Sequence, residues 1–258
     1  MIDVKRVLAP NPGPFTGPGT NSYVVASAGL AVVLDPGPVI PEHMDAIEVA
    51  LGARTPLAVL VTHTHPDHAP AANLLGDRLG TPVLGFAAGP EFVPTHTLGD
   101  GDVVEVGSAA LVAVHTPGHT ADHLCYRIGD VLFTGDHIMG GSTVIIEDAA
   151  TYLRSLRKVE DLAPRHLYPG HGPEIAAASR AITDYINHRL EREDHIVDAI
   201  AGGASTPLEI VQVVYHDVDP DLHVAAAMQV EVQLTKLAAD GRLELHRDDA
   251  EGTSVALP

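Results

Sequence analysis

The stretch at residues 62–68, Thr-His-Thr-His-Pro-Asp-His, constrains this chain more than any other, because it crowds three histidines and an aspartate together. The apolar run at 57–61 precedes it and is typical of a buried strand. Residues 70–75 follow it and predict a helix with proline in its first turn. The polar cluster therefore lies in a loop between a strand and a helix, where side chains from other loops can reach it.

The rest of the sequence up to residue 201 predicts two halves, each with strands followed by helices. This pattern indicates an α/β fold, a four-layer αβ/βα sandwich in which two sheets pack face to face and helices cover the outer faces. In the last helix, the buried stripe is expected at Ile182, Ile186, Leu190 and Ile196. The expected strands are 22–26, 30–34, 57–61, 82–85, 103–106, 109–114, 124–128, 131–134 and 166–168, and the expected helices are 41–51, 71–79, 149–162 and 174–201.

Two glycines at 202–203 predict a boundary between a domain at 1–201 and a second domain at 202–258. The second domain is expected to hold helices at 208–215 and 221–240 and two strands near the end, which is typical of a small winged-helix-like module. Residues 195–258 contain eleven acids against three bases, whereas a DNA-reading helix needs lysines and arginines that face phosphates. We therefore expect the module to pack against the first domain or to form a homodimer, and to bind no DNA.

The composition favours a cytoplasmic protein that does not bind membranes. The net charge of −19 repels polyanions and anionic membrane surfaces. Cys125 is the only cysteine, so an internal disulfide is impossible and a reducing compartment is expected. The first residues lack the apolar core of a signal peptide. No run approaches the roughly 18 apolar residues that a membrane span needs.

Three later loops add polar groups at the ends of predicted strands: His119, Asp136 and His171. Five imidazoles and two carboxylates in all suit zinc or a similar divalent ion. One ion seldom takes seven protein ligands, but two ions do when a carboxylate bridges them and a hydroxide is shared. Because alternate residues of an extended loop point the same way, His63 and His65 should face one ion, and Asp67 and His68 the other.

The motifs His-x-His-x-Asp-His at 63–68, Pro-Gly-His-Thr at 117–120, Gly-Asp at 135–136 and Pro-Gly-His-Gly at 169–172 resemble those of the metallo-β-lactamase superfamily. Segments at 11–21, 135–140, 168–173 and 187–189, together with the terminal module, resemble the beta-lactamase-like protein 2 family, which pairs this domain with a C-terminal winged helix. One departure is Ala69-Pro70, where the family usually has two glycines. The resemblance implies two Zn²⁺ ions, or other divalent ions, with one held by His63, His65 and His119, the second by Asp67, His68 and His171, and Asp136 as the bridge.

These ligands predict a hydrolase in which a metal-bound hydroxide attacks an electrophile, with Asp67 and Asp136 orienting it and Asp67 taking its proton. The family's animal members are described as endoribonucleases acting on single-stranded RNA. The acidic charge and the few aromatic residues favour instead a small acyl substrate, a lactam, ester or thioester. Within this class, a thioesterase similar to glyoxalase II is disfavoured, because the terminal module resembles a winged helix rather than a clamp for a thiol cofactor. A non-enzymatic binding protein is the third alternative, but such proteins lose ligands and all seven are present.

Residues that line the substrate site are harder to predict. The Gly/Pro-rich loop from Asn11 to Asn21 and Met139 are expected to supply an apolar wall. Tyr168 would stack on the substrate or pack in the core, and His188 would reach the substrate or lie on a solvated helix face. The histidines at 115, 123 and 137 are close enough in sequence to support ligands. Those at 43, 96, 166, 195, 216, 223 and 246 are expected at the surface.

Overall fold

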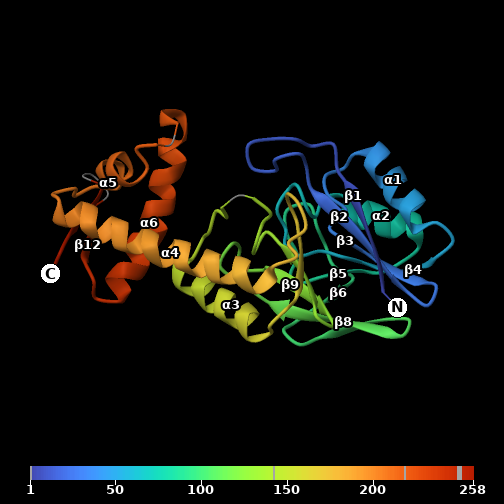
Figure 1. The fold of residues 1–258 in the computed structure, drawn as a ribbon. Helices are drawn as coiled ribbons and strands as arrows, with labels where there is room; N and C mark the ends of the chain where they lie inside the picture. Colours follow the sequence, from blue (N-terminus) through green and yellow to red (C-terminus); the bar gives the residue numbers. More distant parts are fainter. Residues whose placement is uncertain (1, 142, 218, 249–251) are drawn as a thin grey trace.

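The computed structural model describes residues 2–141, 143–217, 219–248 and 252–258, and its first 201 residues form two β-sheets with helices outside them (Figure 1). The first sheet has the strand order β1-β2-β3-β4-β5-β6, and its central strands run parallel from β3 onward. Its strands are β1 (Asp3–Leu8), β2 (Asn21–Ser27), β3 (Leu30–Leu34), β4 (Thr55–Leu60), β5 (Val83–Gly85) and β6 (His96–Thr97).

The second sheet has the strand order β11-β10-β9-β8-β7, in which only β10 and β11 are parallel. The side chains between the two sheets form one apolar core, which includes Val25, Leu60, Leu124 and Phe133. The strands are β7 (Val103–Val106), β8 (Ala109–His115), β9 (Leu124–Ile128), β10 (Val131–Gly135) and β11 (His166–Pro169).

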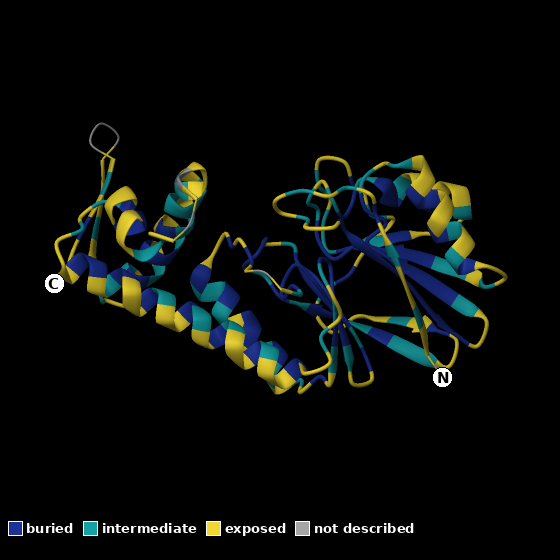
Figure 2. Cartoon of the chain, turned by 45° about the horizontal axis from the view of Figure 1, so that its top comes forward, coloured by how far each residue is buried: buried dark blue, intermediate teal, exposed yellow. Residues whose placement is uncertain are grey.

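Helices α1 (Pro41–Leu51) and α2 (Ala71–Leu79) pack on the outer face of the first sheet around Met44 and Leu75. Helices α3 (Ala149–Asp161) and α4 (Ala178–Ala201) pack on the second sheet around Tyr152. Figure 2 shows the buried residues concentrated in the strands and on the inward sides of these helices. The expected four-layer α/β sandwich is therefore confirmed.

One detail of the prediction is wrong: Leu190 is 38% exposed, and Arg189 and Glu193 are buried in its place. A helix turns once every 3.6 residues, so a stripe stepped strictly by four drifts off the buried face. The observed stripe runs through Ile182, Ile186, Arg189, Glu193 and Ile196.

The C-terminal module contains α5 (Pro207–Val214), the 3₁₀ turn Pro220–Leu222, α6 (His223–Ala239), and the antiparallel pair β12 (Glu244–Asp248) and β13 (Gly252–Ala256). A capping box starts α5: the Thr206 hydroxyl accepts a hydrogen bond from the Glu209 N–H, and the Glu209 carboxylate accepts one from the Thr206 N–H. The module has its own core, to which the last turns of α4 contribute Ile196, Ala199 and Ile200. Across the described ranges, no helix is long and apolar enough to cross a membrane.

Candidate metal centre

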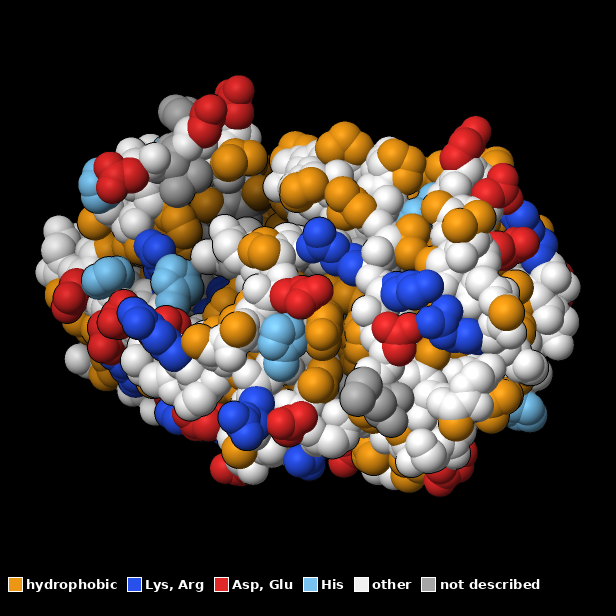
Figure 3. Space-filling model, turned by 45° about the vertical axis from the view of Figure 1, so that its right-hand side comes forward, with side chains coloured by type: hydrophobic (Ala, Val, Ile, Leu, Met, Phe, Trp, Pro, Cys, Tyr) orange, Lys and Arg blue, Asp and Glu red, His pale blue; other side chains and the backbone are white. Residues whose placement is uncertain are grey.

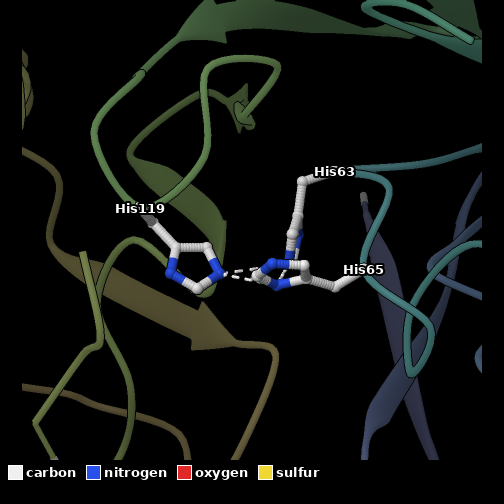
Figure 4. Close-up of side chains that lie close together, drawn as sticks. All are labelled: His63, His65 and His119. Carbon is white, nitrogen blue, oxygen red and sulfur yellow. Dashed lines mark hydrogen bonds between the residues drawn. The ribbon is translucent and has the colours of Figure 1, made fainter. Parts of the chain in front are cut away.

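The first histidine cluster joins the loop after β4 to the loop after β8. His63 and His65 come from the former and His119 from the latter, and the three imidazoles point toward one another (Figure 4). The His63 Nε2 lies 3.0 Å from the His65 Nδ1 and 3.2 Å from the His119 Nε2. The His65 Nδ1 and the His119 Nε2 are 3.0 Å apart. Nitrogens around a tetrahedral zinc ion are about 3.3 Å apart, given zinc–nitrogen bonds of 2.0–2.1 Å. This triangle therefore fits one such ion.

Asp67, His68, Asp136 and His171 form the second cluster. The His171 Nε2 lies 3.0 Å from the Asp67 Oδ2 and 3.2 Å from the His68 Nε2. The Asp136 Oδ1 is 3.3 Å from the His68 Nε2 and 3.4 Å from the His171 Nε2. This buried Oδ1 accepts no hydrogen bond, so it has an unused lone pair for a cation.

Asp136 also connects the two clusters. Its Oδ1 faces the second cluster, whereas its Oδ2 lies 3.8 Å from the His119 Nε2 of the first. A carboxylate with one oxygen toward each of two sites is what a bridged metal pair requires. The chemistry of the donors and their spacing therefore fit two divalent ions.

Four of the imidazoles are oriented by a hydrogen bond at the nitrogen that faces away from the clusters. The Nδ1 of His119 donates to the Ile145 carbonyl at 2.6 Å, and that of His171 to the Gly19 carbonyl at 3.2 Å. The Nδ1 of His68 donates to the Asp35 carboxylate at 3.0 Å, and that of His63 to the Thr62 hydroxyl at 3.0 Å. A proton on Nδ1 leaves the Nε2 lone pair free to bind a metal.

Comparison with known proteins agrees with this geometry. Residues 15–171 match the family described as the metallo-beta-lactamase superfamily, and residues 206–251 match the beta-lactamase associated winged helix domain. The chain belongs to the metallo-β-lactamase superfamily. It is a metal-dependent hydrolase by membership, and the resemblance to beta-lactamase-like protein 2 is confirmed.

The similar proteins differ in name. A beta-lactamase-like protein 2 homolog of Caenorhabditis elegans is 33% identical over 93% of this chain and 86% of its own. An atrochrysone carboxyl ACP thioesterase of Aspergillus chevalieri is 34% identical over 93% of this chain and 82% of its own. A beta-lactamase domain protein of Burkholderia ambifaria has the same fold, with a TM-score of 0.84 at 21% identity over 99% of this chain and 91% of its own.

Asp35 supports the second cluster through a contact that the sequence did not predict. It follows β3, and its buried carboxylate accepts hydrogen bonds from the Thr62 N–H and hydroxyl at 2.7 Å each and from His68. Because β3 and β4 are parallel neighbours, their carboxyl ends lie side by side, which places Asp35 beneath the histidine loop. The sequence offers one signal for this position, an aspartate at a strand end before Pro-Gly. The same pattern is typical of an ordinary turn, so it does not indicate a contact with the histidine loop.

His43 lies behind Asp35, and its expected surface position is wrong. The ring is only 2% exposed, and its Nε2 donates to the Ser22 hydroxyl at 2.8 Å. The Ser22 hydroxyl in turn donates to the Asp35 carbonyl at 2.5 Å. These two hydrogen bonds fix the backbone of Asp35, whose φ of 47° lies in the left-handed region.

Two glycines of the motifs give the ligands the space they need. A Cβ on Gly170 would lie 2.6 Å from the Asp136 Oδ1 and 2.7 Å from the His68 Cε1. Gly118, which precedes His119 in its loop, has a φ of 131°, and a Cβ there would lie 2.4 Å from the Tyr152 Cα. Both positions therefore require glycine.

The charges differ between the clusters. Burial lowers the pKa of His63 and His119, so these two imidazoles of the first cluster are neutral in the metal-free protein. Burial also opposes a charge on His171, but the carboxylates of Asp136 and Asp67 outweigh it and raise its pKa to about 9. Burial would raise the pKa of Asp67, but His68 and His171 lower it to about 2. The second cluster therefore holds protons that a metal ion must displace.

A cavity of about 550 Å³ opens above both clusters. Its walls outside the ligands are Pro14, Phe15, Met139, Thr143, Ile145 and Glu147. Pro14 and Phe15 of the Gly/Pro-rich loop therefore line this cavity together with Met139, and their contact with a substrate stays a prediction. His188 lines a smaller cavity of about 190 Å³, and Thr143 lines both cavities.

Three residues predicted to line the site are placed elsewhere. The Asn21 amide donates to the carbonyls of Pro169 and Gly172 at 2.9 Å each, which ties β2 to the His171 loop. The Asn11 side chain bonds Thr20 and shapes the Gly/Pro loop. Tyr168 stacks on Phe133 with ring centroids 5.1 Å apart and packs against the core between the sheets.

The neighbouring histidines differ in their contacts. The Nε2 of His123 accepts a hydrogen bond from the Asp136 N–H at 3.2 Å, so it supports that ligand as expected. Both ring nitrogens of His137 are buried without a hydrogen-bond partner. His115 stacks on Phe86, away from the ligand atoms. Cys125 is a buried free thiol.

Proposed function

We propose that this protein is a binuclear zinc hydrolase that cleaves an acyl bond, with a thioester as the favoured substrate. The observation that carries the proposal is the pair of clusters joined by Asp136 beneath a cavity with apolar walls. When bound, the two ions supply a water molecule of lowered pKa and polarise the carbonyl oxygen of the substrate.

The residues of the chain then have separate tasks. His63, His65 and His119 hold one ion, and His68 and His171 hold the other with Asp67. The Asp67 side chain is 25% exposed toward the cavity, so its carboxylate can orient the attacking water and take its proton. Asp136 keeps the two sites at a fixed separation, and Phe15 and Met139 shield the carbonyl from bulk water.

The charge of the cavity favours an acyl substrate over RNA. Its described lining contains no lysine or arginine, and its charged side chain outside the ligand set is Glu147. A polyanion needs cationic partners along its backbone. Single-stranded RNA remains the alternative that the resemblance to beta-lactamase-like protein 2 implies.

The comparisons support a thioester in particular. Three relatives named as carboxyl ACP thioesterases align with 92–93% of this chain, so each alignment extends into the winged-helix module. The module is therefore no argument against a thioester, contrary to the expectation from sequence. The identity of the metals is part of the proposal, because a related crystal structure, 27% identical over 69% of this chain with a TM-score of 0.56, holds two irons.

The test is a parallel assay of zinc-loaded protein on an acyl thioester, a carboxylic ester, a chromogenic lactam and single-stranded RNA. We expect the thioester to be hydrolysed and Asp136→Ala to lose both bound zinc and turnover while keeping its circular dichroism spectrum. Cleavage of RNA alone would replace the proposal with the endoribonuclease alternative. Full turnover by metal-free Asp136→Ala protein would refute the metal mechanism.

A further inference from the structure

A segment at residues 144–147 forms one wall of the metal cavity, and the C-terminal module holds it from behind. The side chain of Gln229 on α6 makes two hydrogen bonds to one residue: its Oε1 accepts from the Ile146 N–H at 2.9 Å and its Nε2 donates to the Ile146 carbonyl at 3.1 Å. The Ile145 carbonyl binds His119, and the Val144 carbonyl accepts a hydrogen bond from Arg189. The position of the segment between the two domains is therefore fixed.

A second and larger cavity, of about 720 Å³, lies on the other side of this segment, between residues 145–150 and α6. Ile145 and Glu147 line both this cavity and the metal cavity. The two spaces therefore border one another at these side chains, of which Ile145 is 45% exposed. In Figure 3 the surface is hollowed between the C-terminal lobe and the rest of the molecule, and hydrophobic side chains are visible in the hollow.

The second cavity is long and mainly apolar. Along α6 its lining extends from Met228 to Ala239, a span of about 16 Å at 1.5 Å per residue. Its apolar side chains are Ile145, Ile146, Ala149, Ala150, Met228 and Val232. Met228 is 66% exposed, so its side chain is accessible to a molecule in the groove.

The amide, hydroxyl and cationic side chains in the cavity are already engaged, and Glu147 and Glu231 add two carboxylates to its lining. The Gln229 amide is used by Ile146, and the Thr235 hydroxyl accepts from Arg247 and donates to the Glu231 carbonyl. Lys236 pairs with Glu193 and Asp240. A ligand rich in amides or phosphates would find few partners here, whereas a hydrocarbon chain needs none.

We infer that this groove binds the apolar chain of an elongated acyl substrate, so that the C-terminal module is a substrate-binding element. The inference rests on the proposed acyl hydrolysis. The carbonyl lies over the metal ligands, and the chain passes Ile145 into the groove along Met228 and Val232. The leaving thiol points toward the open mouth of the metal cavity.

The test measures kcat/KM for thioesters of one thiol, N-acetylcysteamine, with acetyl, butanoyl, hexanoyl and octanoyl groups. For the zinc-loaded protein, kcat/KM should rise by about twofold to fourfold per methylene, the upper figure corresponding to the roughly 0.8 kcal/mol of a fully buried methylene. Ala150→Phe, which fills the groove from α3, should abolish this rise with chain length. Ala176→Phe is the matched control, because Ala176 lines a separate cavity that shares no residue with either space.

Two further measurements keep the outcome unambiguous. Met228→Asp puts a charge on an exposed groove position, so it should remove the chain-length preference even if Ala150→Phe folds poorly. Calorimetry of octanoate binding to the metal-free protein tests the groove without turnover, and Ala150→Phe should abolish it. Hydrolysis of the acetyl ester with no gain from longer chains would overturn the groove and leave the proposed function intact. Failure to hydrolyse any acyl compound would overturn the function, and absence of octanoate binding would overturn the groove.

Discussion

Replacing Asp35 with asparagine should weaken the binding of the metal ion at the second cluster by about 10- to 100-fold, the usual effect of losing a partner that orients a ligand. The Asp35 Oδ2 accepts from both the Thr62 hydroxyl and the His68 Nδ1, and the Oδ1 accepts from the Thr62 N–H. In asparagine one of these oxygens becomes an NH₂ group.

The consequence follows from which oxygen is replaced. If the amide oxygen faces the Thr62 N–H, the NH₂ group faces the His68 Nδ1. Because this NH₂ group is a donor, the Nδ1 must accept, and the favoured tautomer of His68 then carries its proton on Nε2. The Nε2 is the atom that lies 3.2 Å from the His171 Nε2 and must offer its lone pair to the metal. If the amide is flipped, a buried N–H of Thr62 loses its acceptor, at a cost of about 1–3 kcal/mol. The expected loss of affinity corresponds to about 1.4–2.7 kcal/mol.

Competition with a chromogenic chelator measures the two metal dissociation constants separately. Asp45→Asn is the matched control, because Asp45 is exposed on α1 and pairs with Arg78. We expect only the weaker of the two constants to change in Asp35→Asn, and the control to match the wild type. Unchanged affinity for both ions in Asp35→Asn would refute the argument that Asp35 sets the tautomer of His68.

Three other substitutions test the site. Gly170→Ala places a methyl group against Asp136 and His68, so metal analysis should find the second ion lost. Phe15→Ala should raise KM without changing the melting temperature, because Phe15 is 63% exposed beside the metal cavity. Burial lowers the pKa of His43, so this ring stays neutral in the folded protein but takes up a proton when unfolded below its ordinary pKa of about 6.5. Its contribution to stability is therefore lost as pH falls below that value, and urea unfolding of metal-free His43→Gln should show a shallower acid decline.

The ligands could be predicted from sequence because each follows an apolar strand and belongs to a short motif. The supporting residues could not, because they depend on which strands are neighbours. Asp35 meets His68 only because β3 pairs in parallel with β4, and Gln229 meets Ile146 across 83 positions of sequence. Nothing local to either residue indicates its partner.

His43 is a different case, because a local signal existed. It lies one turn before Ile47 and two before Leu51, and all three are on the buried face of α1. A histidine at such a position is buried by the helix that carries it, whatever its polarity. Its Nε2 is hydrogen-bonded to Ser22, which the sequence places on a strand with no indication that it approaches α1, whereas its buried Nδ1 has no partner.

The long helix α4 belongs to two cores at once, since Ile182 and Ile186 pack on the second sheet whereas Ile196 and Ile200 pack inside the C-terminal module. If the module after residue 201 were replaced by another domain, Ile196 and Ile200 on α4 would lose the side chains that bury them. The replacement would also remove Gln229, which holds a wall of the metal cavity. The two domains therefore share one helix surface, and a replacement module would need side chains that match the last turns of α4.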